Sequence, residues 1–233
     1  MYTYQDFMKD SARGGLSLAI DTLITRHKAT PEYRIAVDAD LYDSQRNSTI
    51  SNVVKFIYSA NGIKEIDTLS ANNRLCSNFF GRLNTQRNMY SLGNGVFFNN
   101  DSIKKRLGLD FDTKMKTAGY YALIHGISFI FYNLDHIHVF KLTEFAPLWD
   151  EETGALRAGV RFWQIDYKKP VMAVLYEEDG YTKFKKDPEV DSSFVEIESK
   201  RAYRMKVAET KAGDIEIVAE ENYTKLPIVA LYG

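Results

Sequence analysis

The sequence contains a single cysteine, Cys76, so no disulfide bond can form within the chain. A chain without disulfides fits a reducing compartment, or one in which the redox state has no structural role. The N-terminal segment 1–10 contains neither the basic region nor the apolar stretch of a secretory signal peptide. We therefore expect a soluble chain that is made in the cytoplasm.

Long apolar runs and an excess of positive charge are also missing. The best uninterrupted apolar candidate, residues 127–134, is far shorter than the roughly 20 residues that a membrane span needs. The formal net charge is -1, whereas proteins that coat nucleic acid normally carry a basic excess. We expect no contact with a membrane, and contact with DNA only through local patches.

What is present is an ordinary globular composition with helical periodicity at the start. The chain has 233 residues, of which 45% are hydrophobic and 26% charged, so it can bury a core. Residues 1–60 are predicted to be helical. Pro31 begins a new helix there, Thr30 is its expected N-cap, and Asn47-Ser48-Thr49 ends it. The apolar positions of the first helix recur at helical spacing: Leu16, Ala19, Ile20, Leu23 and Ile24.

The next stretch mixes helices and loops. Gly93-Asn94-Gly95 predicts a turn that leads into a short apolar strand at residues 96–98. Short helices are predicted at residues 102–107 and 112–125, and Gly126 is expected to end the second of them. Residues 73–89 are predicted to form one amphipathic helix with Leu75, Phe79, Phe80, Leu83 and Met89 as its apolar positions.

From residue 127 the pattern changes to β-structure. Residues 127–133 and 136–142 predict a hairpin around Leu134-Asp135. The charged stretch 177–200 is expected to be partly loose. The sequence thus predicts an α+β fold, with a mainly helical part at residues 1–126 followed by a mainly antiparallel β-rich part at 127–233. Further strands are predicted at residues 156–165, 170–176, 181–185, 202–209 and 214–219, the last two as a pair.

Few residues suggest catalysis. His136 and His138 lie two positions apart, so on a strand they share a face and could bind a metal, but no third ligand stands at a recognisable spacing. Gly93-x-Gly95 lacks the third glycine and the Lys-Ser/Thr of a phosphate-binding loop. Cys76 is interpreted as a packed side chain of an apolar helix and not as a nucleophile. We predict no catalytic, cofactor-binding or metal-binding residues.

The other charged groups have structural interpretations. His125, close to a predicted helix C-terminus, would interact with the helix dipole. The lysine cluster 183–186 is flanked by acidic residues, which weakens its field and favours a solvated hairpin over a phosphate site. Solvated faces likewise explain the carboxylate pairs Asp38/Asp40, Asp110/Asp112 and Glu151/Glu152.

Several segments, in their order along the chain, resemble the portal proteins of tailed double-stranded DNA phages, in the large family typified by siphophages of Gram-positive hosts. Residues 33–50 are similar to an early helix of that family, and 73–98 to its asparagine-led helix with a glycine-containing turn. Residues 118–132, AGYYALIHGISFIFY, resemble its small-residue helix, glycine and aromatic strand. Residues 145–150 are similar to a turn, 156–163 to a strand with arginine and an aromatic residue, and 222–229 to the closing strand. Thr224-Lys225 departs from the usual glycine of that strand.

The resemblance covers roughly residues 30–233 and implies the α+β wing of a portal subunit. Such subunits form a homo-oligomeric ring, usually a dodecamer, at one vertex of the capsid in the virion. The resemblance implies as partners the major capsid and scaffolding proteins, the terminase, the head-tail connector and the double-stranded DNA that passes through the channel. It implies no enzymatic activity. The stem, clip and crown follow the closing strand in that family, so a truncated chain is expected.

Two other functions are compatible with the residues. One is a small metal-dependent hydrolase that uses His136 and His138. The other is a non-viral interaction module built on a sheet. Self-association of the chain favours the ring subunit over both alternatives.

Overall fold

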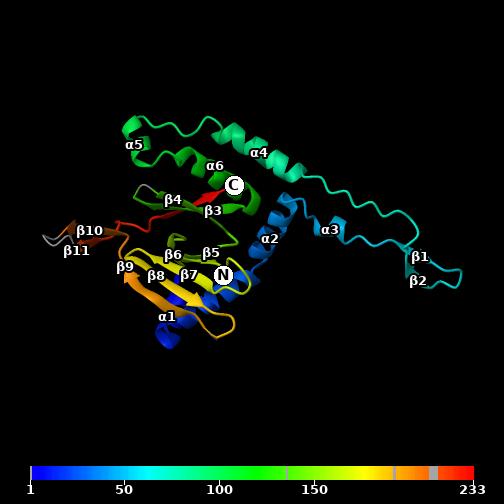
Figure 1. Ribbon diagram of the computed structural model, residues 1–233, viewed down its shortest axis with the longest axis horizontal. Helices are drawn as coiled ribbons and strands as arrows, with labels where there is room; N and C mark the ends of the chain where they lie inside the picture. The colour runs from blue at the N-terminus through cyan, green and yellow to red at the C-terminus, as the bar shows by residue number, and fades with distance from the viewer. Residues whose placement is uncertain (1, 135, 191–192, 210–214) are drawn as a thin grey trace.

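The computed structural model has the α+β fold that the sequence predicts, with helices and mostly antiparallel sheets (Figure 1). It describes residues 2–134, 136–190, 193–209 and 215–233. The body contains two sheets with helices packed against them. Two segments project from this body: the loop that carries α3, β1 and β2, and the β10–β11 hairpin on the opposite side (Figure 1).

The helices begin and end at residues suited to the task. Thr3 forms a capping box with Asp6 at the start of the first helix, and the Thr30 hydroxyl accepts a hydrogen bond from the Tyr33 N–H at the start of the second. Gly126 ends the last helix in the left-handed conformation, with φ 78°. The helices of the described part are α1 (Tyr4–Ala29), α2 (Pro31–Asp43), α3 (Ser48–Ser51), α4 (Phe79–Leu92), α5 (Asp101–Arg106) and α6 (Phe111–His125).

The strands form two sheets and two separate hairpins, all with antiparallel pairing. One sheet has the order β12-β3-β4, and the other runs β5-β6-β7-β8-β9 in chain order, while β1–β2 and β10–β11 are the hairpins. The strands are β1 (Phe56–Tyr58), β2 (Lys64–Ile66), β3 (Ile127–Asn133), β4 (His136–Lys141), β5 (Phe145–Trp149), β6 (Leu156–Trp163), β7 (Val171–Glu177), β8 (Gly180–Lys186), β9 (Val195–Arg201), β10 (Arg204–Glu209), β11 (Ile215–Glu221) and β12 (Ile228–Tyr232).

The predicted hairpins are confirmed. Strands β3 and β4 pair in the expected register, with Asn133 opposite His136, and Leu134 in the turn adopts a positive φ of 56°. Asp135 lies outside the described residues. Strands β10 and β11 also pair as predicted, although the residues between them, 210–214, lie outside the described part.

Two predicted elements are wrong. The helix predicted from residue 73 begins only at Phe79, because the Asn78 side chain accepts a hydrogen bond from the Gly81 N–H at 2.7 Å and caps the helix there. Residues 96–98 are not a strand. They pack against the start of α6 instead. The Val96 N–H donates to the Asp112 carboxylate, and Phe98 packs on Phe111 with ring centroids 5.7 Å apart.

Three strands lie where other structure was expected. Strand β1 lies within the stretch 1–60, which was predicted to be helical, and β5 replaces the turn implied by the portal resemblance. Strand β9 lies in the stretch that was expected to be partly loose. Its charged residues belong to an edge strand, where Lys183 of β8 and Glu198 form an ion pair at 2.6 Å.

The helical and β-rich parts of the sequence bury their apolar side chains together, in two clusters. Helix α1 covers the five-stranded sheet, with Phe7 and Ile20 packed among Leu148, Val160 and other inward side chains. A second cluster lies between the two sheets. It includes Phe129, Phe131, Phe140, Phe145, Val174, Tyr176 and Tyr203.

Gly159 of β6 leaves room for the ring of Phe145 on β5, the neighbouring strand of the same sheet. A Cβ at this position would lie 2.1 Å from Phe145 Cζ, and Phe145 is fully buried against Phe129. We expect Gly159→Ala to destabilise the fold by about 1–3 kcal/mol through overpacking. Urea denaturation measures the change.

The matched control is Gly14→Ala in α1, where the added methyl meets only the movable end of the Leu18 side chain. That variant should stay close to the parent in stability, because Gly14 lies at a kink of α1, beside Gly15 with φ 81°, where the gain of alanine in a helix interior does not apply in full. Equal stability of the two variants would contradict this account of the joint between the sheets.

Candidate functional site

Residues 44–78 form an arm that leaves the body after α2 and returns to it at α4 (Figure 1). The β1–β2 hairpin lies near its outer end. The outgoing and returning legs are joined by hydrogen bonds: the Asp67 N–H donates to the Lys55 carbonyl at 2.9 Å, and Asn72 Nδ2 donates to the Val53 carbonyl at 3.2 Å. The arm is therefore a defined excursion of the chain with its own internal bonding.

The arm carries large apolar side chains that its own chain leaves exposed. Every residue from 51 to 66 is exposed, and Leu69 and Leu75 on the returning leg are 91% and 86% exposed. Many exposed large apolar side chains on one short segment are a feature of interaction sites in soluble proteins. The exposed apolar residues of the arm are Val53, Val54, Phe56, Ile57, Tyr58, Ile63, Ile66, Leu69 and Leu75.

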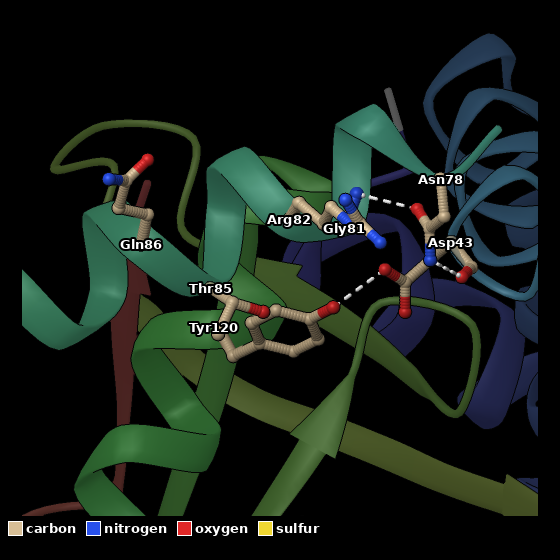
Figure 2. A pocket seen from close by; sticks show the side chains of 7 residues that line it. All are labelled: Asp43, Asn78, Gly81, Arg82, Thr85, Gln86 and Tyr120. Carbon is tan, nitrogen blue, oxygen red and sulfur yellow. Dashed lines mark hydrogen bonds between the residues drawn. The ribbon is translucent and has the colours of Figure 1, made fainter.

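The two ends of the arm are held together at its base (Figure 2). Asn78 Nδ2 donates to the Asp43 carbonyl at 2.6 Å, and the Tyr120 hydroxyl of α6 donates to Asp43 Oδ1 at 2.6 Å. Burial, reinforced by the Asp43 carboxylate, raises the pKa of Tyr120 to about 12. Gly81 is required beside them, because a Cβ there would lie 2.6 Å from Asn78 Oδ1. The base thus fixes where the arm leaves the body.

A second set of contacts fixes α2, from which the arm begins. Asp40 Oδ1 lies 2.9 Å from His125 Nε2 on α6 and 3.3 Å from Lys141 Nζ on β4. Burial acts to raise the pKa of Asp40, but the hydrogen bond from His125 and the charge of Lys141 outweigh it and lower that pKa. Asp40 is therefore a structural ion-pair partner and not the solvated carboxylate that the sequence suggested.

Helix α4 continues the exposed apolar surface of the arm. Its buried positions are Gly81 and Asn88, and Asn88 Nδ2 donates to the Lys116 carbonyl of α6 at 2.8 Å. Small and polar residues thus face the body, while Phe79, Leu83 and Tyr90, at helical spacing on one stripe, are 64%, 63% and 91% exposed. The apolar residues of α4 are therefore not gathered on the face that packs on the body, as they would be in a helix that covers a core.

The predicted histidine pair lies on β4, away from the arm. His136 and His138 share the outer face of the strand as expected, with ring centroids 6.3 Å apart. Burial and the nearby Arg161 charge lower the pKa of His138. Within the described residues, no group of three or more His, Cys, Asp or Glu side chains lies close enough to hold a metal ion.

The remaining candidates have structural roles. Cys76 is half-buried on the returning leg of the arm and not on a helix, because α4 begins after it. Asp112 accepts a hydrogen bond from the Val96 N–H and pairs with Lys104 at 2.6 Å. Lys186 of the lysine cluster binds Asp21 on α1 at 2.7 Å, so this part of the cluster supports the packing of α1 on the sheet.

No family model matches the sequence, and the search of curated proteins gave no significant match. Among the helices in the described part of the chain, none combines the length and apolar character needed to cross a bilayer. The arm was missed by sequence reasoning. A signal was nevertheless present: β-branched and aromatic residues at positions 53–58, followed by Asn61-Gly62, are typical of a hairpin.

The base of the arm can be tested with Tyr120→Phe, which removes the hydroxyl that binds Asp43. We expect a loss of about 1–3 kcal/mol in the free energy of unfolding, the usual range for a hydrogen bond to a charged group. We also expect faster hydrogen exchange at residues 44–50 and 72–78. Tyr121→Phe on the same helix leaves the base intact and is the control; equal effects of both changes would contradict the assigned role.

Asp40→Asn tests the second set of contacts through its pH dependence. A carboxyl whose pKa is lowered by folding stabilises the protein fully above its unfolded pKa of about 3.9, and this stabilisation is lost as the pH falls through the folded value. The variant should therefore be less stable than the parent near neutral pH, by about 1–3 kcal/mol. The difference between the two denaturation midpoints should narrow below about pH 4; a constant difference would argue against the ion pair.

Proposed function

We propose that this chain is the wing of a phage portal subunit, a structural protein of a ring at the capsid vertex. In this role it performs no bond chemistry. The ring passes double-stranded DNA and docks the terminase during packaging, and later the head-tail connector. The observation that carries the proposal is the arm together with the exposed apolar residues of α4, because exposed apolar side chains of this number are a feature of surfaces that bind another protein.

The order of structural elements supports this proposal. The segments that resemble portal proteins correspond to α2, to α4 with the turn after it, and to α6, Gly126 and β3 in succession. Of the last two resembling segments, residues 156–163 correspond to β6, whereas residues 222–229 lie mostly before β12 and include its first two residues. Strand β12 pairs with β3 at the edge of its sheet. The resemblance departs at residues 96–98, which are not a strand, and at β5, which replaces a turn.

The alternatives have less support. The hydrolase depends on His136 and His138, and within the described residues these histidines are not joined by a third metal-ligating side chain. The exposed arm fits a non-viral interaction module as well as a ring subunit. The two functions differ in which molecule would cover the arm. A ring is built from copies of one chain, whereas an interaction module binds a different protein.

Native mass spectrometry with negative-stain imaging distinguishes these functions when applied to the complete product of the gene that encodes this chain. We expect a single large assembly of identical subunits, seen as rings with a central channel. The same measurement on the 233-residue chain provides the reference mass of the subunit. A discrete monomer or dimer of the complete product would overturn the portal proposal.

A further inference from the structure

The body has an unfilled groove whose lining matches the arm in character. The groove has a volume of about 790 Å³ and lies between the start of α2, the edge strands β5 and β12, and β3. It is larger and more apolar than the pocket at the base of the arm, which Asp43, Asn78 and Tyr120 help to line. Its apolar lining includes Leu23, Ile127, Phe129, Leu142, Pro147, Trp149 and Tyr232.

The groove and the arm lie at opposite ends of α2. Thr30, Pro31 and Glu32 at the start of the helix line the groove, whereas the arm begins after Asp43 at its end. The helix has 13 residues, which at 1.5 Å per residue separates the two ends by about 20 Å. The arm also points away from the body (Figure 1). An arm held in this direction by its base presents its tip to another molecule and not to its own groove.

We propose that the arm of one copy of this chain docks in the groove of the next copy. This inference rests on the proposed ring. Because the two surfaces are different, the contact is heterologous, which is the type that generates rings. The area is sufficient: at about 150 Å² for a fully exposed large side chain, the exposed apolar residues of the arm present on the order of 800 Å², close to what each partner of a standard interface buries.

The charges around the two surfaces are complementary. The arm carries Arg46, Lys55, Lys64 and Arg74 against the two acids Glu65 and Asp67. The loop 150–154, which follows Trp149 and reaches the groove at Gly154, carries Asp150, Glu151 and Glu152. With Glu32 in the lining, these four acids face the two basic residues Arg26 of the lining and Arg157, which pairs with Asp150, so the border of the groove keeps an acidic excess. Opposite charges at the border of an apolar contact favour correct pairing and faster association. This complementarity within one sequence favours a second copy over a foreign partner.

The first test compares two triple variants by sedimentation velocity over a concentration series. Phe56→Ser, Ile57→Ser and Ile66→Ser change exposed arm residues, so they leave the body's core unchanged. Ile165→Ser, Tyr167→Ser and Val190→Ser remove apolar side chains from other loops that are even more exposed, and serve as the control. We expect the arm variant to raise the dissociation constant for self-association at least tenfold, while the control behaves like the parent. Circular dichroism checks that both variants are folded.

The second test locates the contact. In a Cys76→Ser background, Ile57→Cys is placed in the arm of one preparation and Tyr232→Cys in the groove of another, which is isotope-labelled. A short bis-maleimide should join one light and one heavy chain when the two preparations are mixed. Replacing the groove cysteine by Ile165→Cys, on a loop outside the proposed contact, gives the background yield.

The outcomes separate this inference from the proposed function. Self-association that is unchanged in the arm variant, or a cross-link no stronger than background, overturns the arm-in-groove contact even where rings are seen for the complete gene product. A 233-residue chain that stays monomeric at the highest concentration also overturns it. The ring itself is judged by the imaging of the complete product, which does not depend on these variants.

Discussion

The contact between Phe145 and Gly159 is the joint on which the rest of the molecule depends. A side chain at position 159 would collide with the Phe145 ring. The glycine thus lets this ring of the five-stranded sheet pack on Phe129 of the three-stranded sheet, with ring centroids 4.5 Å apart. The three-stranded sheet in turn supports α6, whose Ala118 carbonyl accepts a hydrogen bond from the buried Ser128. Helix α6 then holds α2 and α4, the two helices between which the arm extends. The position of the arm is thus set by a close packing contact far from it in the sequence.

The arm itself is a segment that its own chain cannot stabilise by burial. A two-stranded hairpin is at best marginally stable alone in water, and β1 and β2 are only three residues each. Ordering a residue costs roughly 1–2 kcal/mol of backbone entropy, and exposed apolar side chains contribute little to offset that cost. The hydrogen bonds between its legs and the contacts at its base give it a direction. In the proposed ring, the next copy supplies the missing burial. The exposed apolar residues of α4 likewise lack burial by their own chain.

Much of the fold could be predicted from sequence because its signals are local. Thr30-Pro31 begins α2, Gly126 ends α6, and the β3–β4 and β10–β11 pairs follow from alternating apolar runs. The arm and α4 could not be predicted in this way, because periodicity identifies an apolar face without identifying what covers it. The sequence predicts Leu75, Phe79 and Leu83 as apolar positions of one helix, yet the helix begins at Phe79 and buries Gly81 and Asn88 instead. The close contact between α4 and α6 at Asn88 and Gly119 depends on tertiary packing, and no rule of residue spacing predicts it.

The rigidity of the base has a consequence for assembly. A heterologous contact closes into a ring only when each copy is rotated by a fixed fraction of a turn; otherwise it grows as an open filament. In the proposed ring, that rotation depends on the angle at which the arm leaves α2. The angle is held by Asp43, Asn78 and Tyr120 at the base and by the Asp40 contacts to α6 and β4. Polar contacts of defined geometry thus set the direction, and the apolar tip supplies affinity. In this proposal, partly buried Asp40 and Asp43 of α2 hold the direction of the arm, while the apolar residues of the arm face out.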